Sequence, residues 1–285
     1  MLTVDGVEGL IVSSRPSGRL LQGSTIALLG LSILLGAIIA DPDLIPHHGP
    51  LPWLLPQIVL VFLIILIVRN SKKQRNRSQL MTDAFEAVQL QQWERARALF
   101  NQLLRSPIRY PTARAESLLG LAAVAESDHA YEASQRIYEC LLQEKTADPI
   151  QLHTVRVAMA AAMLRTGQTA DAVALIDRLS RMKLPGPLRA QVELLQLFRE
   201  VTMGHGADAI ECAEERRELF RQFLSTRAGY GYGLLAAAFD RANSPAQAQR
   251  CWHDATLLVP PTDLVKRFKE LDPIRQRYVA AEIRL

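Results

Sequence analysis

Residues 232–260 read YGLLAAAFDRANSPAQAQRCWHDATLLVP, and this stretch decides the fold. Apolar residues recur three or four positions apart before Asn243 and again after Pro245, which predicts two amphipathic helices joined by a short turn. The small side chain of Ala248 in the second helix permits close contact with the first helix. Pro260 ends the stretch. Residues 232–260 are therefore predicted to form one antiparallel helix pair.

The same pattern recurs upstream at a regular interval. Alanines in the equivalent position are separated by 37, 39 and 76 residues, and the last gap equals two periods of 38 with a further alanine between them. These alanines are Ala96, Ala133, Ala172, Ala209 and Ala248. From residue 78 onward the apolar spacing is helical throughout. A fixed period of this size predicts helix pairs that stack and share a continuous core.

This repeat resembles the tetratricopeptide repeat (TPR) family, whose unit is a pair of antiparallel helices of about 34 residues. The last repeat carries the family's spacing of large, small and proline positions, except that Asn243 replaces the glycine that usually ends the first helix. Asparagine tolerates the left-handed conformation needed there. The resemblance covers residues 79–261. It is weakest in the fourth repeat, where Ala213 and Arg216 replace the expected packing residues, so the fourth repeat's membership stays open.

We therefore expect an all-α chain: an N-terminal two-helix transmembrane hairpin, an α-solenoid of about five TPR-like helix pairs, and C-terminal capping helices. The expected divisions begin with an N-terminal segment (residues 1–19) and the hairpin (20–68) with its outer loop (41–50). A basic linker (69–77), the repeat domain (78–261) and the cap (262–285) follow.

Two apolar runs support the hairpin. Residues 20–40 contain no charge over 21 positions, and residues 51–68 contain none over 18. About 20 apolar residues in a helix cross a hydrocarbon core of about 30 Å. A cleaved signal peptide is the alternative for the first run. It is disfavoured because Ile38 stands where a small residue is needed and because a second apolar run follows directly.

Basic residues predict the orientation of this hairpin. The loop at residues 41–50 has no lysine or arginine, whereas five basic residues follow the second run directly. This cluster is Arg69, Lys72, Lys73, Arg75 and Arg77. Both termini and the repeat domain are therefore expected in the cytoplasm, with the basic cluster against anionic headgroups. The chain resembles the membrane-anchored bacterial type of TPR protein, which implies the bacterial inner membrane. Ser32, Gly36 and Ala40 share one face of the first run and predict close helix packing in the membrane.

The composition points away from catalysis and from nucleic acid. The formal net charge of +4 is accounted for by the basic cluster, so the rest of the chain is close to neutral. The three cysteines lie far apart in the sequence, which excludes a disulfide scaffold and a paired-cysteine zinc site. The sequence contains no phosphate-binding loop, metalloprotease motif or nucleophile elbow. We expect no catalytic residue, metal, cofactor, small-molecule substrate or nucleic acid.

The resemblance to TPR proteins also implies a partner-binding groove. In that family the first helices of successive repeats line a concave surface that holds an extended or helical peptide. The equivalent positions here include Phe85, Arg114, Leu121, Leu164, Arg165, Tyr230 and Arg241. They are apolar with a few arginines, so an apolar helix or strand carrying some acidic residues is the expected ligand.

Two functions are consistent with these features. The first is a membrane-anchored TPR-like adaptor or scaffold that binds partner proteins with its cytoplasmic solenoid. The second is an accessory subunit or assembly factor of a larger membrane complex, contacted through the transmembrane hairpin. Neither the partner nor the oligomeric state can be deduced from the sequence.

Overall fold

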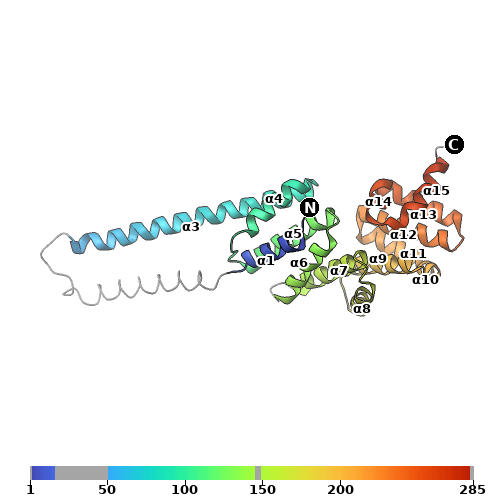
Figure 1. Ribbon diagram of the computed structural model, residues 1–285, viewed down its shortest axis with the longest axis horizontal. Coiled ribbons are helices and arrows are strands. Elements are labelled where there is room, and N and C mark those ends of the chain that lie inside the picture. The colour runs from blue at the N-terminus through green and yellow to red at the C-terminus, as the bar shows by residue number, and fades with distance from the viewer. Residues whose placement is uncertain (1, 17–50, 145–148, 283–285) are drawn as a thin grey trace. The chain divides into compact units, whose positions relative to one another are not determined.

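The computed structural model of the chain describes residues 2–16, 51–144 and 149–282. Within these ranges the regular elements are helices and there is no strand, so the all-α prediction is confirmed (Figure 1). The chain forms two compact units, residues 1–147 and residues 148–285, which we call unit 1 and unit 2.

One kind of turn recurs five times in the described part of the chain. At each turn between the two helices of a pair, one residue adopts a positive φ, between 55° and 82°. The N–H of the following residue donates to the carbonyl five positions earlier, at 2.8 to 2.9 Å, which satisfies a carbonyl at the end of the first helix. The left-handed residues are Gln91, His129, Gly167, Gly204 and Asn243. They are 38, 38, 37 and 39 residues apart, and Asn243 has the conformation expected from the sequence.

The repeated alanines follow these turns and are all buried. None of the five exposes more than 2% of its surface: Ala96, Ala133, Ala172, Ala209 and Ala248. The predicted period is therefore real over five helix pairs, including the fourth. In that pair the second helix is broken at Cys212, which separates α10 from α11.

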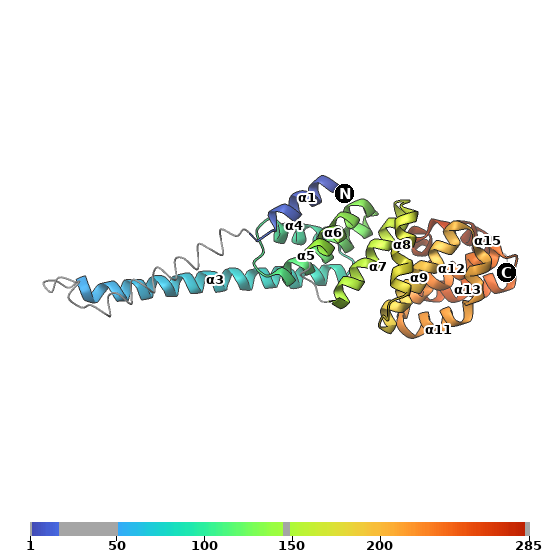
Figure 2. The same cartoon turned by 90° about the horizontal axis from the view of Figure 1, so that it is seen from below.

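Unit 1 contains the first two pairs and an additional N-terminal helix. Its helices are α1 (Val4–Ser13), α3 (Leu51–Gln89), α4 (Trp93–Leu104), α5 (Pro111–Ser127) and α6 (Tyr131–Gln143). Helix α4 packs between α3 and α5, and α1 lies against α4 and α6 (Figure 2). The ring of Phe100 lies where a Cβ at Gly120 would be, so the absence of a side chain at Gly120 lets α4 approach α5.

Unit 2 contains the remaining three pairs and a C-terminal closure. The pairs are α7 (Pro149–Arg165) with α8 (Thr169–Ser180), α9 (Gly186–Met203) with α10 (Gly206–Glu211) and α11 (Ala213–Phe223), and α12 (Ala228–Arg241) with α13 (Pro245–Leu258). The closure is α14 (Pro261–Arg267), a short turn η3 (Lys269–Leu271) and α15 (Asp272–Glu282). It buries Leu264, Phe268, Leu271, Ile274 and Tyr278.

The predicted hairpin lies only partly within the described residues. The run at residues 20–40 and the loop at 41–50 are outside them. Residues 51–68 form the first part of α3, and the side chains of residues 51–60 are not among those described. In residues 2–16, 51–144 and 149–282, no helix was found with both the length and the apolar character needed to cross a membrane.

Candidate functional site

Helix α1 docks onto the repeat through its apolar face. Val7 is fully buried and Ile11 is 6% exposed, four residues apart on one side of the helix. Thr3 caps the N-terminus of the helix, since its Oγ1 accepts from the N–H of Gly6 at 3.3 Å. Glu8 on the outer side accepts from Nε of Arg136 in α6 at 2.7 Å. The N-terminal segment therefore belongs to the folded core of unit 1.

Arg114 is the polar centre of this dock. Its guanidinium is 3% exposed and donates to the Ser14 Oγ and to the Ile11 carbonyl, each at 3.0 Å. Its third contact is an ion pair with Glu144. A cation at the C-terminal end of a helix satisfies carbonyls that lack partners within the helix. Arg114 was predicted to line a groove, but here it joins α1 to the start of α5 and the end of α6.

Glu144 also affects the neighbouring thiol. Cys140 donates from Sγ to Glu144 Oε1 at 3.3 Å. Burial raises the pKa of Cys140, and the charge of Glu144 raises it further, while Arg114 lowers it. A thiol that stays protonated is a poor nucleophile, so this cysteine has a structural environment.

The loop between α4 and α5 contacts the chain on both sides of residues 20–68, which contain the two apolar runs and which we call the apolar segment. The N–H of Ile108 donates to the Ser14 carbonyl at 3.1 Å, just after α1. From the other side, Arg77 in α3 donates to the Pro107 carbonyl at 3.0 Å and to the Ser106 Oγ at 2.7 Å. We call residues 105–110 the α4–α5 loop. The chain on either side of residues 17–76 is therefore held at one loop.

The predicted basic cluster divides into two parts. Arg77 is half-buried and is engaged by the α4–α5 loop. The other four side chains are exposed along α3: Arg69, Lys72, Lys73 and Arg75. Of the five basic side chains in the cluster, only these four are free to contact anionic headgroups.

The remaining groove residues predicted in unit 1 pack against the unit's own chain. Leu121 is fully buried. Phe85 is half-buried, with its ring edge-on to that of Phe100 at 5.5 Å between centroids. Phe85 therefore packs within the first helix pair, and Leu121 belongs to the core of unit 1.

In unit 2 the structure does bring two of the predicted groove residues together, around a residue of the C-terminal closure. The guanidinium carbon of Arg165 is 5.8 Å from the ring centroid of Phe198 and 5.6 Å from that of Phe268. Tyr230 meets Phe268 edge-on at 5.9 Å between centroids. Phe268 is 2% exposed, so this residue of the closure fills the space between the side chains that α7, α9 and α12 supply.

The last two predicted groove residues differ from each other. Leu164 is 8% exposed and belongs to the core of unit 2. Arg241 is exposed at the end of α12, and its Nη1 donates to the carbonyl of Val201 in α9. Of the seven predicted groove residues, Arg241 is the one whose surface is mainly open to solvent.

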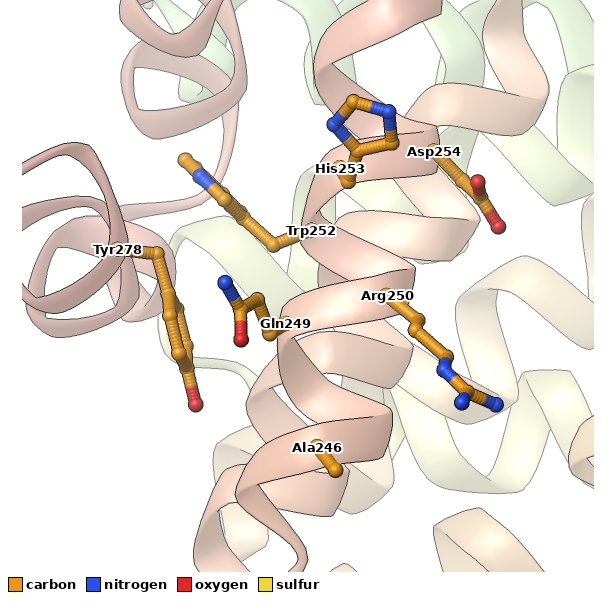
Figure 3. Close-up of a pocket in the computed structure, with 7 residues that line it drawn as sticks. All are labelled: Ala246, Gln249, Arg250, Trp252, His253, Asp254 and Tyr278. Atoms are coloured by element: carbon orange, nitrogen blue, oxygen red, sulfur yellow. The ribbon is translucent and has the colours of Figure 1, made fainter. Parts of the chain in front are cut away.

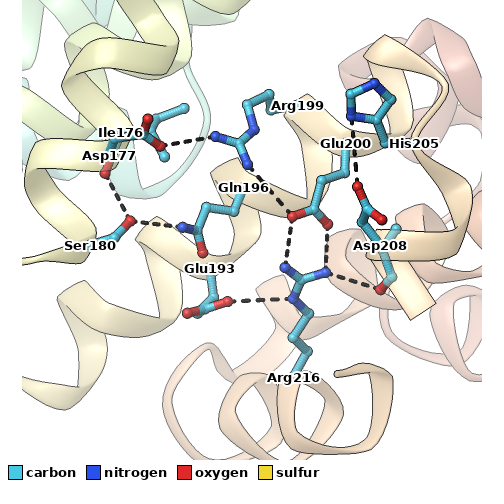
Figure 4. Close-up of polar contacts among 11 residues, drawn as sticks. Ile176, Asp177, Ser180, Glu193, Gln196, Arg199, Glu200, His205, Asp208 and Arg216 are labelled. Atoms are coloured by element: carbon cyan, nitrogen blue, oxygen red, sulfur yellow. Dashed lines mark hydrogen bonds and ion pairs between the residues drawn. The ribbon is translucent and has the colours of Figure 1, made fainter. Parts of the chain in front are cut away.

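A buried ion-pair cluster supports the irregular fourth pair (Figure 4). Arg216 donates to Glu200 Oε2 at 2.7 Å and to Oε1 at 3.1 Å, and to Glu193 Oε2 at 3.4 Å. It also donates to the Ala209 carbonyl at 3.0 Å, three residues before the break at Cys212. Burial lowers the pKa of Arg216, but Glu200 and Glu193 more than reverse this effect. Arg216 thus stabilises the fourth pair through buried ion pairs, where the TPR pattern has an apolar packing residue.

A pocket with a volume of about 370 Å³ lies between α13 and α15 (Figure 3). Gln249 points toward Tyr278, whereas Arg250 and Asp254 point to another side of α13. Asp254 pairs with Arg217 at 2.8 Å. The polar side chains do not converge on one point, so the geometry supplies no paired acid and base.

Within the described ranges no three histidine, cysteine or acidic side chains are grouped so that they could hold a metal ion. The predicted packing face of Ser32, Gly36 and Ala40 lies outside those ranges and stays a prediction. Comparisons with protein-family models, with curated proteins and with solved structures found no match.

Sequence reasoning missed the dock of α1. The signal available was short: Val4, Val7 and Ile11 recur at helical spacing after a threonine that can act as an N-cap. Nothing in the sequence indicates that the C-terminal end of this helix meets Arg114, one hundred residues after Ser14.

Proposed function

We propose that the chain is a membrane-anchored helical-repeat adaptor, similar to TPR proteins, which holds partner proteins at the cytoplasmic face of a bacterial inner membrane. Anchoring confines a bound partner to a surface and raises its effective concentration there. The proposal has two parts, the anchor and the binding of partners, and each has its own test.

The continuity of α3 is the observation that carries the anchor. This helix runs unbroken over 39 residues. Aliphatic side chains along its first half are 50 to 61% exposed: Val61, Ile64, Ile65, Ile67 and Val68. Exposed basic side chains follow from Arg69, and Ala84 and Ala87 are buried in unit 1. A cluster of exposed branched aliphatic residues is unfavourable in water and favourable in lipid, and adjacent basic residues suit anionic headgroups.

The test of the anchor is extraction of membranes with alkaline carbonate, which removes peripheral proteins. We expect the full chain to stay in the membrane pellet and a variant lacking residues 20–68 to be released. The matched control is replacement of Lys72 and Lys73 by Gln, which removes charge but leaves the apolar segment. Release of the full chain would contradict the anchor.

Two features support the binding part. The described chain is built as repeated helix pairs, an architecture that presents extended surfaces to other proteins. Arg241 is the predicted groove residue with the most open surface, so it is the position at which a partner is expected.

Site-specific photo-crosslinking in membranes tests the binding part. A photoreactive residue replaces Arg241 in one variant and Arg221, which is also exposed, in a matched control. We expect a discrete protein adduct at position 241 and none at position 221. The same adducts at both positions, or none at either, would contradict binding at this surface.

A further inference from the structure

The two ends of the apolar segment are held at the same point of unit 1. The Ser14 carbonyl accepts from Ile108 at 3.1 Å, and Arg77 donates to Pro107 and Ser106. Ser13 adds a bond from its Oγ to the Leu104 carbonyl at 2.9 Å. The α4–α5 loop therefore contacts the chain just before and just after residues 17–76.

Each end can reach one common membrane surface from this loop. Between Arg77 and Val68 the chain is helical, and nine residues of helix rise about 14 Å. The six residues from Ser14 to Leu20 can extend over at most about 20 Å. Leu20 and Val68 are the ends of the two apolar runs that lie nearer to the α4–α5 loop in sequence. Both can therefore lie at the same distance from this loop.

The opposite arrangement is physically excluded for a folded unit 1. If the apolar segment crossed the membrane once, α1 and the repeat helices would lie on opposite sides of a hydrocarbon core of about 30 Å. The contacts of Ser14 with Ile108 and Arg114 are 3.0 to 3.1 Å long, so they could not form across that distance.

We infer that docking of α1 couples the fold of unit 1 to the topology of the anchor: unit 1 is complete only when residues 17–68 leave it and return at the same membrane face. This inference rests on the proposed membrane anchor. Arg114 is the group that makes the coupling strong, because without α1 its buried guanidinium loses both Ser14 and the Ile11 carbonyl.

The experiment crosslinks α1 to α6 in the full chain within isolated membranes. Glu8→Cys and Arg136→Cys replace an exposed ion pair whose charged atoms are 2.7 Å apart, and Cys212→Ser removes the exposed native thiol. Cys140 and Cys251 are buried. We expect a short bismaleimide to join the two introduced thiols within one chain. In intact cells, a thiol reagent that cannot cross the membrane should label the Glu8→Cys and Arg136→Cys single variants identically.

A second variant keeps this result specific to the dock. Val7→Asp places a charge in the buried face of α1. In the crosslinking background it should abolish the crosslink and make unit 1 sensitive to protease, while the chain still sediments with membranes. Gly9→Ala is the matched control, because a Cβ at Gly9 would have no neighbour within 4 Å. It should leave the crosslink unchanged.

The possible failures are distinguishable. A membrane-bound chain that does not crosslink, or that is labelled at position 8 and not at position 136, would overturn this inference alone. A Val7→Asp chain that still crosslinks would overturn it too. A crosslinked chain recovered in the soluble fraction would overturn the proposed anchor and, with it, the topological coupling.

Discussion

Units 1 and 2 are both built from repeated helix pairs, but they are closed in different ways. Unit 2 is closed by helices that follow its last repeat directly, so every part of it comes from residues 148–285. Unit 1 is closed by α1, which is separated from the first repeat by the apolar segment. Unit 2 is therefore self-contained in sequence, whereas unit 1 needs residues from both sides of residues 17–50.

Two buried arginines, Arg216 and Arg114, show the same contrast. Arg216 in unit 2 is neutralised by Glu200 and Glu193, which lie on α9, the first helix of the same pair. Arg114 in unit 1 uses Ser14 and the Ile11 carbonyl, which come from α1. The partners of a buried arginine can therefore come from the same helix pair, as for Arg216, or from a segment distant in sequence, as for Arg114.

The largest effect is expected at Arg216. Replacing it with Met leaves Glu200, whose side chain is 10% exposed, without its main partner. We expect the free energy of unfolding of unit 2 to fall by about 4 kcal/mol, because an uncompensated charge stays buried. Chemical denaturation followed by hydrogen exchange in each unit measures this, and unit 1 should be unaffected.

The control for Arg216 is Arg221→Met, which breaks an exposed pair with Glu218 and should leave the unfolding transition unchanged. The double variant with Arg216→Met and Glu200→Leu should recover most of the loss. Equal losses in the single and double variants would show that the ion pair is not the cause.

At Arg114 the expected loss is somewhat smaller. Replacement with Met removes one of the two donors to the Ile11 carbonyl, which keeps its bond from the Ser14 Oγ at 3.1 Å, while Glu144 is 23% exposed and keeps partial contact with water. We expect unit 1 to lose about 3 kcal/mol and α1 to lose its protection from hydrogen exchange.

Arg136→Met is the matched control for Arg114, because it also removes an arginine that contacts α1, through the exposed Glu8. It should leave both the stability and the protection of α1 intact. If the two variants lower stability equally, burial of Arg114 is not what secures the dock.

Much of this molecule could be predicted from its sequence, because the repeat is a local pattern. The alanines at a period near 38 and the left-handed turn at Asn243 depend on neighbours within a few residues, and both are present. These features need no knowledge of distant contacts.

The candidate site was harder to predict, because it depends on contacts distant in sequence. Arg114 occupies a groove position by register, yet its partners are Ser14 and Ile11. Tyr230 and Arg165 do meet, but around Phe268. Register places a residue on a helix face, and only the tertiary structure shows what covers that face.

A smaller effect is expected where α4 approaches α5. In Gly120→Ala the new Cβ would overlap the ring of Phe100, so the ring or the helix must move. We expect unit 1 to lose about 2 kcal/mol from overpacking, measured by thermal unfolding. The Gly9→Ala change in α1 should be neutral or slightly stabilising, because alanine favours the helix and the added Cβ touches nothing. A neutral Gly120→Ala variant would contradict the close packing.

The smallest effect concerns the pH dependence of unit 2. Burial raises the pKa of Cys251 from 9.0 to about 11. Because the unfolded chain loses this proton first, the contribution to stability is present below pH 9 and is lost as the pH rises from 9 to 11. Cys251→Ala should therefore flatten the decline in melting temperature over that range. An unchanged slope would show that the thiol ionises equally in both states.

One loop holds both ends of the apolar segment in a unit that α1 closes. Replacing residues 17–71 with about ten Gly and Ser residues tests it most directly, because such a linker spans about 17 Å on average and suffices only if the two ends are close. The measurement is hydrogen exchange across α1 in the purified variant. We expect a water-soluble chain in which α1 is as protected as the helices of the repeat. Exchange in α1 as fast as in an unstructured peptide, with α4 to α6 still protected, would contradict it.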